Sequence, residues 1–75
     1  MENEMKENIN KIFGKNVRLF RRKKGLTQEE LAEKCHCYQH YISEVENGKR
    51  SISLQTCFII AEVLEVSLEE LISER

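Results

Sequence analysis

The amino-acid sequence predicts an all-α fold, a compact bundle of five helices joined by short connections. Apolar residues recur at intervals of three and four, and no segment shows the alternation of polar and apolar residues that is typical of a strand. Two short sequences, beginning at Thr27 and Ser67, match the capping box that begins a helix. Gly25 and Gly48 follow helical patterns and are typical of helix ends.

The first predicted helix has one apolar face and runs through a basic cluster before it ends at Gly25. Residues 1–14 are expected to form an N-terminal extension that leads into this helix. Gly14 lies inside the helical pattern and weakens it by about 1 kcal/mol relative to alanine. The apolar residues spaced by three and four are Ile9, Ile12, Phe13, Val17 and Phe20.

Residues 27–46 have the layout of a helix-turn-helix. Thr27 begins a short second helix through a capping box, and residues 35–38 form a turn. A third helix over residues 39–46 ends before Gly48, a strong signal for a helix C-terminus.

A fourth helix over residues 54–64 is apolar nearly all round, and Ser67 begins a short fifth helix. No linker, repeat or low-complexity segment divides the 75 residues, so a single domain is expected over residues 1–75. The apolar residues of the fourth helix are Leu54, Cys57, Phe58, Ile59, Ile60, Ala61, Val63 and Leu64.

The net charge of −1 conceals a strong asymmetry along the chain. Residues 15–50 contain nine Lys or Arg and five Glu, a local charge of +4. Residues 51–75 contain one Arg and five Glu, a local charge of −4. Because the local field steers a polyanion, the basic half is compatible with nucleic-acid binding despite the balanced total.

Composition also indicates the cellular compartment of the protein and the functional classes that it does not support. No apolar run is long enough to span a membrane, and the polar, acidic N-terminus differs from a secretory signal. Three cysteines cannot all pair within one chain, so a reduced, cytoplasmic protein is expected. An enzyme is poorly supported, because the chain has no Asp, no Gly-rich phosphate loop and no convincing metal set. No cofactor and no small-molecule substrate are expected.

The sequence from residue 16 to residue 72 resembles the Cro and phage-repressor (XRE-type) helix-turn-helix family. Three stretches carry the resemblance, namely G-L-T-Q-E-E-L-A, Y-I-S-x-V-E-N-G-K-R and L-x-V-S-L-E-E-L. The resemblance implies a five-helix domain of the lambda-repressor-like type, whose third helix enters the major groove of double-stranded DNA. It also implies a homodimer, whose two-fold axis requires a pseudo-palindromic operator.

The candidate base-reading residues lie on one face of the third helix. Their spacing of i, i+1, i+4 and i+5 places them opposite the apolar residues of that helix. Glutamine can bind adenine, glutamate can accept from cytosine, and a neutral histidine offers one donor and one acceptor. The candidates are Gln39, His40, Ser43 and Glu44. The resemblance selects Gln39, His40 and Glu44 among them.

A second set of residues is expected to contact the DNA backbone. Gln28 lies at the start of the second helix, where its amide and the nearby N–H groups suit a phosphate. Tyr41 either contacts a phosphate or packs against the protein. The resemblance adds the residues after the third helix, Asn47, Lys49 and Arg50.

The resemblance further implies a structural ion pair between Arg21 and Glu46, which links the first helix to the end of the third. This pair removes one arginine of the basic cluster from the DNA-binding set. The others, Arg18, Arg22, Lys23 and Lys24, are either solvated or supply a general positive field.

The turn departs from the family pattern. Cys35, His36 and Cys37 replace an aliphatic residue, a glycine and a second aliphatic residue, so His36 is expected to adopt a positive φ. The spacing does not suit a zinc site, and no metal is expected. Three small buried hydrophobic residues, with Cys57 as the third, are the preferred interpretation, although a redox role of the thiols stays open.

Ile59 and Val63 lie one turn apart on the fourth helix, at positions where relatives often carry polar residues. We expect them at a dimer interface, since a second copy would cover excess apolar surface. The alternative is that residues 5–13 fold back over this helix. The predicted function is therefore a homodimeric, autoregulatory transcription regulator, with restriction–modification controller, phage and antitoxin regulators as possible subclasses and a protein-binding adaptor as the alternative.

Overall fold

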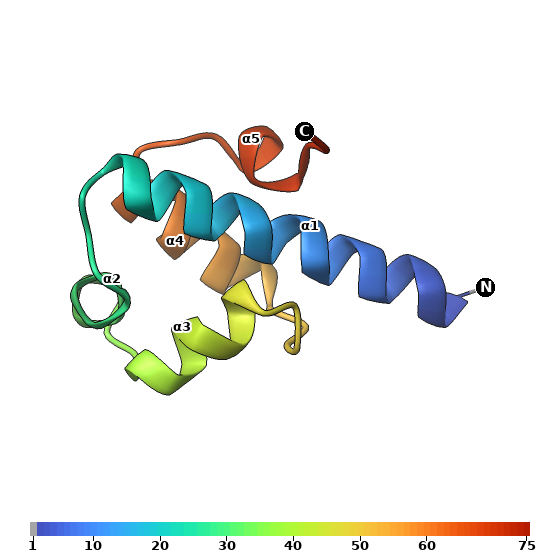
Figure 1. Ribbon diagram of the computed structural model, residues 1–75, viewed down its shortest axis with the longest axis horizontal. Helices are drawn as coiled ribbons and strands as arrows, with labels where there is room; N and C mark the ends of the chain where they lie inside the picture. Colours follow the sequence, from blue (N-terminus) through green and yellow to red (C-terminus); the bar gives the residue numbers. More distant parts are fainter. Residues whose placement is uncertain (1) are drawn as a thin grey trace.

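The computed structural model describes the backbone of residues 2–75 and the side chains of residues 8–75. Over this range the chain forms five helices and no strand, which confirms the predicted all-α fold. The helices are α1 (Glu2–Lys23), α2 (Gln28–Lys34), α3 (Gln39–Glu46), α4 (Leu54–Leu64) and α5 (Leu68–Ile72). Figure 1 shows α1 as one long helix whose N-terminal end projects beyond the others.

The caps that the sequence predicts are present. The Thr27 hydroxyl accepts from the Glu30 N–H and the Glu30 carboxylate accepts from the Thr27 N–H, and Ser67 and Glu70 repeat this arrangement at α5. Gly25 and Gly48 have φ values of +76° and +71° and follow α1 and α3. A further cap, at Ser53, begins α4 and accepts from the Thr56 N–H.

The long first helix organises the packing. It contacts α3, α4 and α5, while α2 packs against α3 and α4 packs against α5. The core where these helices meet is apolar, and its largest fully buried side chains are Leu31, Ile42, Ile60, Leu71, Val17 and Val45. The alternative in which residues 5–13 return over α4 is wrong, because these residues continue α1 without a break.

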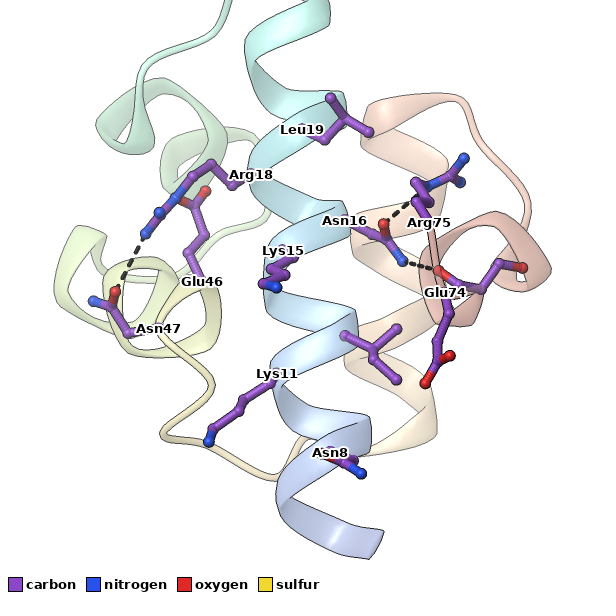
Figure 2. Close-up of a pocket in the computed structure, with 12 residues that line it drawn as sticks. Asn8, Lys11, Lys15, Asn16, Arg18, Leu19, Glu46, Asn47, Glu74 and Arg75 are labelled. Atoms are coloured by element: carbon purple, nitrogen blue, oxygen red, sulfur yellow. Dashed lines mark hydrogen bonds and ion pairs between the residues drawn. The ribbon is translucent and has the colours of Figure 1, made fainter. Parts of the chain in front are cut away.

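Asn16 ties the end of the short fifth helix to α1. Its side chain is buried, and its amide donates to the carbonyl oxygens of Leu71 at 2.9 Å and Ser73 at 2.8 Å. Its side-chain oxygen accepts from the Arg75 guanidinium at 2.9 Å (Figure 2). One buried polar side chain thus satisfies two carbonyl groups at the C-terminal end of α5.

Candidate nucleic-acid interface

The third helix presents a polar face opposite the side that it buries. Ile42, Val45 and Glu46 are buried, and the core contacts of these residues fix which face of α3 turns outward. The four candidate base readers occupy the outer face. Gln39 and His40 are exposed there, and Ser43 and Glu44 are half-buried. A helix held in this way can enter a major groove with its polar face toward the base edges.

Arg21 and Glu46 form a buried ion pair between α1 and the end of α3. The Arg21 guanidinium donates through Nε to Glu46 Oε2 at 2.6 Å and through a terminal nitrogen to Oε1 at 3.1 Å. Its other terminal nitrogen donates to the Leu26 carbonyl at 2.8 Å. Because both partners are buried and bidentate, the contact restrains the orientation of α3 more firmly than a surface pair would.

Two further side chains bind the same carboxylate. Gln28 Nε2 donates to Glu46 Oε1 at 3.0 Å, a contact within the protein that the sequence did not indicate. Arg18 Nε lies 3.4 Å from the same oxygen, and its terminal nitrogen donates to Asn47 Oδ1 at 3.2 Å (Figure 2). Glu46 therefore joins three helices.

The charge of Glu46 is set by this cluster. Burial acts to raise the pKa of its carboxyl, but the hydrogen bonds from Arg21 and Gln28, the Arg21 charge and the Arg18 contact outweigh burial and hold the pKa below its usual value. Glu46 is therefore ionised at neutral pH. No buried side-chain nitrogen or oxygen within residues 8–75 lacks a hydrogen-bond partner.

The segment after α3 is shaped by a glycine turn. Gly48 has φ +71°, its N–H donates to the Val45 carbonyl at 3.0 Å, and the Lys49 N–H donates to the Glu44 carbonyl at 2.9 Å. These two bonds form a Schellman motif. The turn leaves Asn47, Lys49 and Arg50 exposed beside α3 and brings Arg50 to Tyr41, a half-buried residue that packs against the core.

The basic side chains in and just after the last turns of α1 make more contacts within the protein than the sequence indicated. Lys24 pairs with Glu65 and Lys23 lies 5.6 Å from the centre of the Phe20 ring, while Arg18 joins the Glu46 cluster. The spacing of Arg18 and Arg21, three residues apart on one helix face, is the signal that could have revealed the role of Arg18. Arg18 and Lys24 pair with carboxylates within the protein, a role not predicted for either residue.

The helix-turn-helix turn contains the expected positive φ. His36 has φ +58° and is exposed. Cys35 is buried, but Cys37 and Cys57 are only half-buried, which corrects the prediction of three buried cysteines. Burial raises the pKa of Cys35 to about 11, so its reactive thiolate is scarce. Within the described side chains, no three metal-binding groups gather at one place.

The fourth helix carries three of the six large apolar side chains that are exposed among residues 8–75. Leu54, Phe58 and Ile59 have exposed fractions of 69%, 54% and 36%. Val63, predicted at the same surface, is half-buried and packs against the core. The exposed face is therefore displaced toward the N-terminal half of α4. No helix in the described chain has the length and hydropathy to cross a membrane.

The sequence of this chain matches the helix-turn-helix family over residues 17–71. The control protein C.BamHI of Bacillus amyloliquefaciens is 38% identical over 69 residues, which cover 91% of this chain and 85% of that protein. The control protein C.SmaI of Serratia marcescens is 36% identical over 67 residues, which cover 89% of this chain and 80% of that protein.

Solved structures share the same fold. The restriction-modification controller protein C.AhdI from Aeromonas hydrophila superposes with a TM-score of 0.81 at 34% identity, covering 87% of this chain and 94% of that one. The hypothetical transcription factor NHTF from Neisseria gives a TM-score of 0.84 at 34% identity, covering 91% and 78%. These matches span most of the chain and are not confined to one motif. The protein therefore belongs to the helix-turn-helix (XRE-type) family of DNA-binding transcriptional regulators.

Proposed function

We propose that the protein is a homodimeric, sequence-specific regulator that binds a pseudo-palindromic operator and controls its own gene. The observation that carries the proposal is the polar outer face of α3, held by the Glu46 cluster and opposite a buried apolar face. Two relatives are named as control proteins, and this supports a controller-type regulator. We expect the protein to act in the cytoplasm.

The division of labour follows from the positions of the side chains. Gln39 and His40 begin α3 and are exposed, so they are the proposed readers of base edges together with Ser43 and Glu44. Tyr41, Asn47, Lys49 and the N-terminus of α2 at Gln28 are proposed to contact phosphates. The phosphate contacts supply affinity that falls with salt, while the base contacts supply sequence preference.

The homodimer is supported by the exposed apolar face of α4. Leu54, Phe58 and Ile59 gather on one short helix of a small chain, and a second copy related by a two-fold axis would cover them in both protomers. Two recognition helices in that arrangement would read half-sites about 34 Å apart. Coupling of dimerisation to DNA binding would make the concentration of the protein itself the regulatory input.

The test is selection of bound duplexes from a random-sequence library by the purified protein, followed by fluorescence anisotropy at two salt concentrations. We expect a two-fold symmetric motif, present upstream of the protein's own gene, bound about 10³-fold more tightly than scrambled DNA. Gln39→Ala combined with His40→Ala should abolish this preference, whereas Gln55→Ala, an exposed glutamine on α4, should leave it unchanged.

Failure to enrich any motif would contradict the proposal. A stoichiometric protein partner, together with no salt-dependent DNA binding, would instead support the adaptor alternative. Equilibrium sedimentation of the same sample tests the dimer separately, because a monomer that still selects a single half-site would contradict only the dimeric part.

A further inference from the structure

Arg50 folds back over α3. The glycine turn at Gly48 reverses the chain after α3, so Arg50 lies beside side chains of the helix that precedes it. Its Nε donates to Glu44 Oε1 at 2.8 Å, and its guanidinium carbon lies 5.0 Å from the centre of the Tyr41 ring. A hydrogen-bonded ion pair and a cation–π contact hold one side chain from two directions.

The two oxygens of the Glu44 carboxylate have different surroundings. Oε1 accepts the short bond from Arg50, whereas Oε2 lies 3.5 Å from His40 Nε2, beyond a normal hydrogen bond. The Arg50 hydrogen bond holds the pKa of Glu44 below its usual value, so the carboxylate is charged at neutral pH. Glu44 therefore keeps acceptor capacity at Oε2 after pairing with Arg50.

A carboxylate in the major groove faces an electrostatic obstacle, because phosphates line both edges of the groove. A paired guanidinium cancels that charge locally and still leaves the free oxygen available. Among the base edges in the major groove, only cytosine N4 and adenine N6 offer amino donors, and glutamate characteristically accepts from cytosine. Thymine and guanine present acceptors at the corresponding positions and would repel the carboxylate.

We propose that Arg50 is a positioning residue for base recognition, which holds Glu44 as the acceptor for the exocyclic amino group of an operator cytosine. This inference rests on the proposed function and deepens it. It also separates Arg50 from Lys49: Lys49 remains a phosphate contact, whereas the Arg50 guanidinium is committed to Glu44 and Tyr41. Glu44 and Arg50 act as one unit.

The experiment compares Glu44→Gln, Arg50→Gln and the double variant with the wild type. Each is measured on the selected operator and on a panel in which every base pair is changed singly, over a series of salt concentrations. We expect Glu44→Gln and Arg50→Gln to reduce discrimination at the same C·G pair by about 10-fold. The double variant should lose no more than Glu44→Gln alone, since the pair acts jointly.

Lys49→Gln is the matched control, because it removes the neighbouring positive charge without removing a Glu44 ion pair. It should weaken all operators equally and reduce the magnitude of the negative slope of log K against log salt by about 0.9, while Arg50→Gln should leave that slope unchanged. Thermal unfolding of each variant verifies that it is folded.

Unchanged base preference in Arg50→Gln would overturn the inference whatever happens to the slope. A slope whose magnitude falls by about 0.9 in Arg50→Gln would also overturn it, since Arg50 would then be a phosphate contact. Both results leave the proposed function intact. Absence of any selected motif for the wild type would overturn the proposed function and this inference with it.

Discussion

Gly14 of α1 lies directly against the carbonyl oxygen of Val45 at the end of α3. A Cβ at position 14 would lie 2.8 Å from the Glu46 carbonyl oxygen and closer still to that of Val45. Both obstacles are backbone atoms, which cannot rotate away as a side chain can. The absence of a side chain at residue 14 therefore permits the close approach of α1 and α3.

Gly14→Ala should destabilise the protein although alanine favours a helix by about 1 kcal/mol. We expect the free energy of unfolding in urea to fall by about 1–3 kcal/mol, because α1 and α3 must separate. The DNA affinity should fall with it, since α3 moves. Gly25→Ala is the control: its φ of +76° costs about 1 kcal/mol, but no atom beyond the two neighbouring residues lies within 4 Å of the added Cβ, so DNA binding should be preserved. Greater stability of Gly14→Ala than of the wild type would contradict this account.

Glu46→Gln tests the buried cluster. It leaves the Arg21 guanidinium buried without a counter-charge, and we expect a loss of about 3 kcal/mol in the free energy of unfolding. Glu44→Gln, two residues earlier on the same helix, breaks an exposed pair and should cost less than about 1 kcal/mol. Equal costs in the two variants would show that burial of the Glu46 cluster contributes nothing to stability.

The contribution of Glu46 to the free energy of unfolding should depend on pH. The folded-state pKa of Glu46 lies below its unfolded value, so its contribution is fully present above about pH 4.3 and is lost as the pH falls through the folded pKa. The difference in unfolding free energy between wild type and Glu46→Gln should therefore be constant from pH 6 to pH 8, and should narrow in acid. Urea denaturation of both proteins from pH 8 down to pH 3 measures this difference. Curves that stay parallel down to pH 3 would contradict the assigned charge state.

His36→Gly should stabilise the protein by about 1 kcal/mol. His36 is exposed at φ +58°, a conformation that costs a residue with a Cβ about 1–2 kcal/mol. His36→Ala keeps that cost while removing the imidazole, so it isolates the effect of the backbone. Thermal and urea unfolding of the three proteins give the comparison. If the glycine variant is no more stable than the alanine variant, the turn carries no strain at this residue.

Phe58→Lys should dissociate the proposed dimer. It places a charge on the exposed apolar face of α4, and we expect the dimer dissociation constant in equilibrium sedimentation to rise at least 100-fold. Ile9→Lys is the control, because Ile9 has a similar exposed fraction, 58%, but lies on α1. An unchanged dimer in Phe58→Lys would move the interface away from this helix face.

The parts of the fold that could be predicted from sequence depend on local interactions. The capping boxes at Thr27 and Ser67 and the glycines that end α1 and α3 act within a few residues, so their signals lie in adjacent letters. The positive φ of His36 was predicted from the family resemblance, because His36 stands where the family pattern has a glycine.

Contacts between distant segments could not be derived in this way. Arg18 meets Glu46 across 28 residues and Gln28 meets it across 18. The spacing of Arg18 and Arg21 is a local signal for the first contact, but nothing in the local pattern of Gln28 indicates which carboxylate it binds. The sequence of α1 indicates only that Gly14 weakens the helix, because its contact with the Val45 carbonyl oxygen depends on the packing of α3. Likewise, the rotation of α4 about its axis decides that Phe58 is exposed and Val63 half-buried.

The tie between Asn16 and α5 has a consequence for the cooperativity of the domain. A helix of five residues cannot persist alone in water, so α5 depends on its contacts with the rest of the domain, among them the α1 amide of Asn16 that binds the Leu71 and Ser73 carbonyls. Its backbone amides should therefore exchange with deuterium at the rate of global unfolding rather than by local fraying. The shortest helix would then be among the most faithful reporters of whether the whole chain is folded.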